Sequence, residues 1–120
     1  MEIKSVKEID SYTTKDKSEI REIFNPSNST IKDMSLAVAT VSVGKSTEYH
    51  FHRRSDEIYY ILLGMGILEI EGEEKKVREN DCVLIPVRKR HKITNVGKVP
   101  LKILCISYPP YSHDGTVLVE

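Results

Sequence analysis

The chain has 120 residues, with 18 basic and 18 acidic side chains and a formal net charge of zero. This balance gives no reason to expect nucleic acid or an anionic membrane as a partner. The longest apolar-rich run, residues 58–68, is too short to cross a bilayer, and the first residues lack the apolar segment of a signal peptide. Two separated cysteines, Cys82 and Cys105, are typical of buried thiols in a reducing compartment. We therefore expect a single cytoplasmic domain over residues 1–120.

Most of the chain has the pattern of short β-strands separated by turn residues. Branched and aromatic side chains favour strands, and Gly, Pro, Asn and Asp favour the turns between them. Residues 1–9 are interpreted as an edge strand or a short lead-in, residues 11–18 and 25–33 as loops, and residues 72–74 as a hairpin turn. Residues 64–66 turn the chain into the strand that follows. The predicted strands cover residues 19–24, 34–43, 58–63, 67–71, 75–78, 82–85, 91–96 and 101–108.

Turn signals recur about every 8–12 residues, and the sequence shows no long amphipathic helix. Such a pattern indicates an all-β barrel or sandwich, in which closure or a second sheet protects the strand edges. We expect the barrel core at residues 34–108. The N-terminal strands and loop cover residues 1–33, and a tail covers residues 109–120. The interior of such a barrel could hold a ligand.

One segment, residues 44–64, concentrates groups that can bind a metal ion. His50 and His52 are two residues apart, so on a strand both side chains face the same side. The carboxylate of Glu57, five residues later, could reach the same place. His91 begins a later strand and could cross the barrel to join them. Neutral imidazoles and a carboxylate suit Zn, Fe, Mn, Ni or Cu.

These residues resemble the two sequence motifs of the cupin superfamily. The first motif, G-x5-H-x-H-x4-E-x6-G, is met in full, by Gly44, His50, His52, Glu57 and Gly64. The second, G-x5-P-x-G-x2-H-x3-N, is matched at Pro86, His91 and Asn95, while its two glycine positions hold Asn80 and Arg88. Asn80 can adopt a positive φ almost as readily as glycine. Arg88 adds a long cation to the turn that precedes His91.

The resemblance implies a fold, a cofactor and an assembly. Cupins form a small double-stranded β-helix, or jelly roll, and the matched residues hold one divalent transition metal ion. By this resemblance His50, His52, Glu57 and His91 are the four metal ligands, and the ion is Fe, Mn, Zn, Ni or Cu. The resemblance also implies a homodimer that forms by packing barrel sheets and exchanging terminal strands.

Four residues near the predicted site are candidates for contacting a substrate: Arg88, Arg54, Tyr59 and Arg21. An arginine offers two parallel hydrogen bonds to a carboxylate or phosphate. A solvated basic rim is the favoured explanation of Arg54 and Arg88. Tyr59 is more readily explained as a residue of the core or the barrel wall, and Arg21 lies on a segment that could line the barrel mouth.

Fold alone does not select a reaction, so two classes of function stay open. The leading hypothesis is a metal-dependent enzyme of the dioxygenase, isomerase, epimerase or decarboxylase type, which acts on a small polar or anionic metabolite. The competing hypothesis is a non-catalytic sugar- or metabolite-binding protein or sensor. A third, weaker hypothesis is a barrel whose histidines hold no metal.

Overall fold

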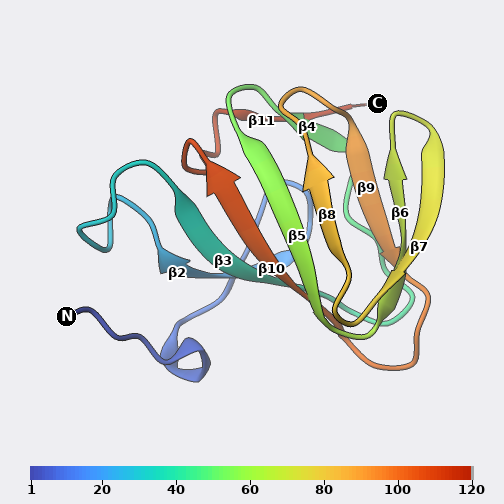
Figure 1. The fold of residues 1–120 in the computed structure, drawn as a ribbon. Coiled ribbons are helices and arrows are strands. Elements are labelled where there is room, and N and C mark those ends of the chain that lie inside the picture. Colours follow the sequence, from blue (N-terminus) through green and yellow to red (C-terminus); the bar gives the residue numbers. More distant parts are fainter. Residues whose placement is uncertain (120) are drawn as a thin grey trace.

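The computed structural model describes residues 1–119, which form two antiparallel β-sheets that lie face to face (Figure 1). The six-stranded sheet has the order β1-β2-β3-β10-β5-β8 and the five-stranded sheet has the order β11-β4-β9-β6-β7. The first sheet consists of β1 (Tyr12–Thr13), β2 (Glu19–Phe24), β3 (Ser35–Val41), β5 (Asp56–Leu63), β8 (Cys82–Ile85) and β10 (Leu101–Tyr108). The second consists of β4 (His50–His52), β6 (Met65–Ile70), β7 (Glu73–Arg78), β9 (His91–Asn95) and β11 (Thr116–Leu118). The predicted double-stranded β-helix is confirmed.

The core lies between the two sheets, because side chains alternate between the inner and outer face of each strand. Every second residue of β3 is buried. Its inward positions include Ala37 and Ala39, whose small side chains leave space inside the barrel. The remaining interior is filled by aliphatic side chains, among them Ile61, Leu68, Ile85, Ile93, Leu101 and Ile103.

Two segments near the chain ends differ from the prediction. Residues 11–18, expected as a loop, contain the short strand β1, whereas residues 1–9 form the lead-in rather than the edge strand and contain a short 3-10 helix, η1 (Val6–Glu8), none of whose residues is buried. The predicted tail contributes β11, which pairs with β4. Neither end carries the regular alternation that identifies a strand, and β11 is only three residues long.

The hairpin between β6 and β7 turns one residue earlier than predicted. Ile70 pairs with Glu73, so the two loop residues are Glu71 and Gly72. Their φ angles are 49° and 84°. Positive φ at both positions is the signature of a type I′ turn, which suits the right-handed twist of the flanking strands. Residue 66, expected in a turn, lies within β6.

The two residues that stand in place of motif glycines both adopt the left-handed backbone conformation. Asn80 has φ 75° and Arg88 has φ 68°. The tight turns of the motif therefore form without glycine. For Arg88 this conformation is unfavourable, because its Cβ crowds the backbone at positive φ.

The two cysteines differ from the prediction that both thiols are buried. Cys82 is exposed on β8 and Cys105 is partly buried, and both are free. Within residues 1–119 no helix is long and apolar enough to cross a membrane.

Candidate metal centre

The three motif histidines lie on two neighbouring strands of the five-stranded sheet. His50 and His52 are both buried on the inner face of β4. His91, the first residue of β9, is the direct cross-strand partner of His50. The sequence suggested that His91 crosses the barrel to join the other histidines, and this was wrong. His91 lies on the strand next to theirs. Glu57 is the residue that approaches from the opposite, six-stranded sheet, where it lies on β5.

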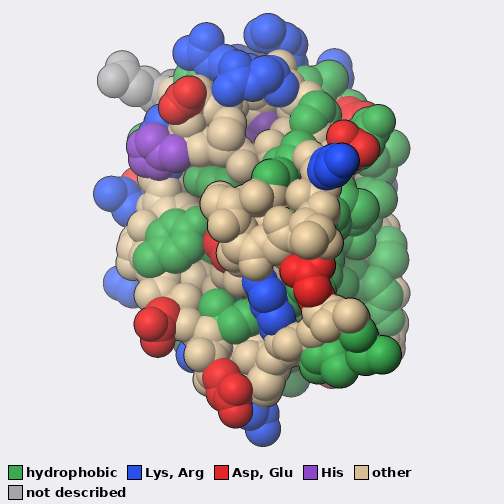
Figure 2. Space-filling view, turned by 90° about the vertical axis from the view of Figure 1, so that its left-hand side faces the viewer, with side chains coloured by type: hydrophobic (Ala, Val, Ile, Leu, Met, Phe, Trp, Pro, Cys, Tyr) green, Lys and Arg blue, Asp and Glu red, His purple; other side chains and the backbone are tan. Residues whose placement is uncertain are grey.

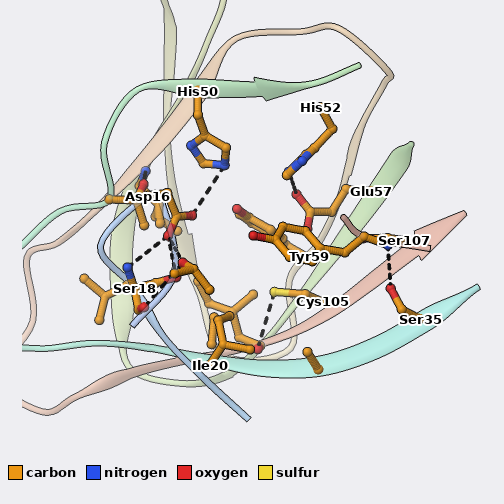
Figure 3. A pocket seen from close by; sticks show the side chains of 18 of the residues that line it. Asp16, Ser18, Ile20, Ser35, His50, His52, Glu57, Tyr59, Cys105 and Ser107 are labelled. Carbon is orange, nitrogen blue, oxygen red and sulfur yellow. Dashed lines mark hydrogen bonds and ion pairs between the residues drawn. The ribbon is translucent and has the colours of Figure 1, made fainter. Parts of the chain in front are cut away.

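The ligand atoms of these residues converge, and Figure 3 shows how His50, His52 and Glu57 lie. The three histidines each offer a ring nitrogen within 4.8 Å of the others. Oε1 of Glu57 lies 3.1 Å from Nε2 of His52 and 3.4 Å from Nε2 of His91. Three histidines therefore stand close enough together to hold a metal ion, with a carboxylate beside two of them.

Hydrogen bonds at Nδ1 orient each imidazole. Nδ1 of His50 lies 2.7 Å from the backbone oxygen of Glu48, and Nδ1 of His91 lies 2.9 Å from that of Lys89. A carbonyl oxygen can only accept, so each Nδ1 carries the hydrogen and each Nε2 is left with its lone pair.

For His52 the partner is a hydroxyl rather than a carbonyl. Its Nδ1 lies 3.2 Å from Oγ1 of Thr116, and that hydroxyl donates to the backbone oxygen of Ser112 at 3.0 Å. The single hydroxyl hydrogen is therefore used, and Thr116 accepts from His52. Partners of this kind fix the tautomer of metal-binding histidines.

The positions of these residues leave electron pairs on nitrogen and oxygen atoms that a cation would bind. Nε2 of His91 is buried and has no hydrogen-bond partner. A neutral His52 ring with its hydrogen on Nδ1 also presents a lone pair to the Glu57 carboxylate 3.1 Å away, which is unfavourable unless a cation or a second ring hydrogen lies between the two atoms. A divalent cation accepts electron pairs from both, so these residues fit a metal ion.

The same proximity shifts the acid–base properties of the site. Burial, together with the neighbouring His91, lowers the pKa of His50 to about 4. Burial alone would lower the pKa of His52 and raise that of Glu57. The contact between the two outweighs burial, so the pKa of His52 is raised and that of Glu57 is lowered. At neutral pH the site thus offers neutral His50 and an ionised Glu57.

Comparison with known proteins identifies the family. The family model described as the cupin domain matches residues 37–107. The chain belongs to the cupin family. An uncharacterized protein of Methanocaldococcus jannaschii is 50% identical over 109 residues, which cover 91% of this chain and 87% of that protein.

Solved structures share the cupin fold at low identity. A predicted oxalate decarboxylase of Thermotoga maritima matches with a TM-score of 0.79 and 24% identity, over 90% of this chain and 99% of that one. The polyketide cyclase RemF of Streptomyces resistomycificus matches with a TM-score of 0.81 and 19% identity, over 100% of this chain and 86% of that one. At such identities the likeness shows the fold alone.

Asn95, the last residue of the second cupin motif, has a structural role. Its Nδ2 donates to the backbone oxygens of Val41 and Val99, at 3.0 and 2.9 Å. Its Oδ1 accepts from the backbone N–H of Gly97 at 2.9 Å. The buried amide therefore joins β9 to β3 and to the turn before β10. These hydrogen bonds connect the two sheets at the end of β9 opposite to His91.

The structure places one further acidic residue at the site of this cupin, and sequence reasoning missed it. Oδ2 of Asp16 lies 3.4 Å from Nε2 of His50. Asp16 belongs to the turn between β1 and β2, and its backbone oxygen accepts from the N–H of Glu48 at 2.7 Å. Flanking hydroxyl residues, Thr14 and Ser18, signal a turn here. The contact with residue 48 depends on tertiary packing, which local sequence does not report.

A cavity opens beside the histidines and extends between the sheets. The empty volume of the cavity, taken together with the open solvent at its mouth, is about 540 Å³. Tyr59 lines it, buried at 4% exposure, with its ring centre 6.0 Å from that of His91. Within residues 1–119 the lining includes none of the three arginines proposed from the sequence.

The three arginines lie outside the cavity for separate reasons. Arg21 alternates with Ile20 and Glu22, which line the cavity, so its side chain is on the outer face of β2. Arg54 is exposed, and its Nη2 lies 3.4 Å from Oγ of Ser112 in the C-terminal segment. Arg88 is exposed on the turn before β9. Figure 2 shows lysine and arginine side chains gathered at one end of the molecule. Substrate contact by these arginines or by Tyr59 stays a prediction.

Proposed function

We propose that this cupin binds one divalent transition metal ion through His50, His52, Glu57 and His91, and acts as a metal-dependent enzyme on a small polar metabolite. The observation that carries the proposal is the convergence of imidazole nitrogens whose other ring nitrogen is already hydrogen bonded, with Nε2 of His91 buried and unpartnered. A divalent ion at such a site supplies a Lewis acid that polarises a bound oxygen atom.

The chain's own residues have distinct parts in this proposal. Glu57 brings a negative charge to the histidines from the opposite sheet. Tyr59 and the aliphatic lining exclude bulk water from one side of the cavity. The Tyr59 phenol stays protonated at neutral pH, because burial raises its pKa well above the usual value. It can therefore donate a hydrogen bond to a bound molecule but cannot act as a phenolate base.

Metal analysis tests the binding half of the proposal. We expect untagged protein to carry about one transition metal ion per chain, and E57Q to bind it more weakly by at least about tenfold, since loss of a hydrogen-bond partner of a ligand already costs that much. Metal content is measured by elemental analysis after dialysis, and affinity by calorimetric titration. A protein that holds no stoichiometric metal, and whose thermal stability is indifferent to a chelator, would contradict the assignment.

Turnover tests the catalytic half. Metal-loaded protein is incubated with a panel of small polar metabolites, with and without O2, and products are followed by mass spectrometry. We expect turnover that is lost in H50A. Binding without turnover under every condition would instead favour the competing function, a metabolite-binding protein.

We also infer that two copies pair through the outer face of the six-stranded sheet. That face exposes apolar side chains of Ile58, Leu62, Leu84 and Tyr108. Hydrophobic side chains gather along one side of the molecule in Figure 2. These four side chains are uncharged, so they suit a second identical copy, because pairing them brings no like charges together within this patch.

A further inference from the structure

The cavity next to the histidines is lined by carboxylates but not by cations. Asp16, Glu22 and Glu57 all line it, whereas no lysine or arginine in the described part of the chain does so. Aspartate and glutamate side chains are negative near neutral pH. Three such charges exceed the two positive charges of a divalent ion, so the cavity keeps a net negative charge when an ion is bound.

The lysines on either side of Asp16 do not neutralise it. Nζ of Lys15 donates to the backbone oxygens of His113 and Thr116, at 3.1 and 2.9 Å. Lys17 is exposed and lines a separate surface groove together with Lys45. Both ammonium groups are therefore directed away from the cavity.

Asp16 is held with one oxygen facing the cavity. Its Oδ1 accepts hydrogen bonds from the backbone N–H and the hydroxyl of Ser18, at 2.9 and 2.6 Å, and from the hydroxyl of Thr14 at 2.5 Å. Oδ2 is left pointing toward His50. Figure 3 shows Asp16 and Glu57 on opposite sides of the cavity, with Tyr59 between them in that view.

Glu22 adds another carboxylate to the lining of the cavity. Its Oε1 accepts from the hydroxyl of Tyr12 at 2.9 Å, and Nδ2 of Asn25 lies 3.4 Å from its Oε2. Like those of Asp16, these donors are uncharged. The positions of the two carboxylates are therefore fixed by uncharged partners, and none of these partners is a cation that would offset their charge.

We propose that this cavity accepts small molecules that are uncharged or cationic and donate hydrogen bonds, such as polyols and amino alcohols, and that Asp16 and Glu22 discriminate against organic anions. A fixed carboxylate in a partly buried site repels an incoming anion and accepts hydrogen bonds from hydroxyl or ammonium groups. The proposal rests on the proposed function, since the ligand would occupy the cavity beside the same ion.

The test uses three two-carbon probes that differ mainly in charge: glycolate, ethylene glycol and ethanolamine. Protein loaded with Zn²⁺ to one ion per chain, as checked by elemental analysis, is titrated with each probe by ligand-detected NMR. The variants are D16N, E22Q and D16N/E22Q, which keep the side-chain shape and remove the charge. The control is E19Q, because Glu19 is exposed and lines the outer groove rather than the cavity.

Relative to wild type, we expect D16N/E22Q to bind glycolate about tenfold more tightly and ethanolamine about tenfold more weakly. Ethylene glycol should change by less than about twofold, since it carries no charge to repel or attract. E19Q should match wild type with all three probes. Opposite changes for the anion and the cation arise only from charge, and a purely structural role would not produce them.

Two results would overturn the proposal. One is an unchanged or weakened affinity for glycolate in D16N/E22Q. The other is an equal loss with all three probes, which would assign the carboxylates a structural role. The single variants decide the matter if the double variant does not fold. A protein that takes up no zinc contradicts the proposed function instead, and the same titrations on zinc-free protein then decide this inference.

Discussion

The tautomer of each imidazole is fixed by a hydrogen bond between its Nδ1 atom and another group of the protein. Two backbone oxygens and one threonine hydroxyl occupy the Nδ1 positions, so all three Nε2 atoms are directed inward. Backbone oxygens are insensitive to mutation, whereas the partner of His52 is a side chain. Thr116 is therefore the point at which the orientation of the site can be changed by a single substitution.

We expect T116V to lower metal affinity by about tenfold or more, since the hydrogen-bond partners that orient ligating histidines typically contribute that much. Valine keeps the shape of threonine but cannot accept from Nδ1 of His52 or donate to the oxygen of Ser112. The measurement is a calorimetric titration with Zn²⁺. L118T, an exposed position on the same strand, is the control. Equal affinities for T116V and wild type would show that the hydroxyl does not orient His52.

Arg88 provides a residue-scale test of backbone strain. We expect R88G to stabilise the protein by about 1 kcal/mol, because glycine adopts a φ of 68° without steric cost. K89G should destabilise it, since Lys89 does not have a positive φ and glycine there only adds disorder to the unfolded chain. Chemical denaturation measures both. A less stable R88G would mean that the arginine side chain makes contacts that outweigh the strain.

At the scale of elements, strand identity was accessible from the sequence and strand neighbours were not. Residues 19–24, 82–85 and 101–108 were predicted as strands from composition and turn residues, and they form β2, β8 and β10. The position of His91 was wrong, because local sequence does not say that β9 lies next to β4. Pairing between strands depends on contacts between residues far apart in the chain.

At the candidate site too, the local sequence predicted some features and not others. The spacing of His50 and His52 implies a shared face, since strand side chains alternate, and the structure has both on the inner face of β4. The approach of Asp16 to His50 and of Thr116 to His52 depends on tertiary packing. Neither residue belongs to a motif, and each lies in a polar segment with few strand-forming residues.

The contact between Glu71 and Arg90 joins two parts of the five-stranded sheet and predicts how the stability of the fold depends on pH. Glu71, in the β6–β7 turn, accepts from the backbone N–H of Arg90 and from two nitrogens of its guanidinium, at 2.7, 3.1 and 3.0 Å. The Arg90 hydrogen bonds and charge lower the pKa of Glu71 to about 2. Because the folded pKa lies below the unfolded value of 4.5, folding favours the ionised form.

The stabilisation from Glu71 should therefore be complete above about pH 4.5 and be lost as the pH falls toward 2. We expect E71Q to have a lower melting temperature than wild type at pH 7, and the difference to shrink toward zero near pH 2. The effect is small, because the pair is exposed to solvent. E74Q, an exposed carboxylate on β7, is the control. A difference that does not depend on pH would assign the loss to something other than the carboxylate charge.

At the scale of the whole molecule, the apolar outer face of the six-stranded sheet predicts assembly. We expect the wild-type protein to be a dimer and L84K to be a monomer, because the substitution places two ammonium groups at the shared face. Leu84 is 60% exposed in the single chain, so lysine there should not disturb the core. Light scattering after size exclusion gives the mass. E74K, on the other sheet, should remain dimeric, and a monomeric wild type would refute the pairing.

The pairing of β11 with β4 has a consequence for how the protein is made. His50 and His52 are synthesised well before Thr116, so the orienting partner of His52 does not yet exist when the two histidines leave the ribosome. Metal loading in the final geometry must therefore follow synthesis and docking of the segment that contains Thr116. The ion that the proposed site acquires would then reflect the exchangeable metals of the cell at that moment as well as the affinity of the ligands.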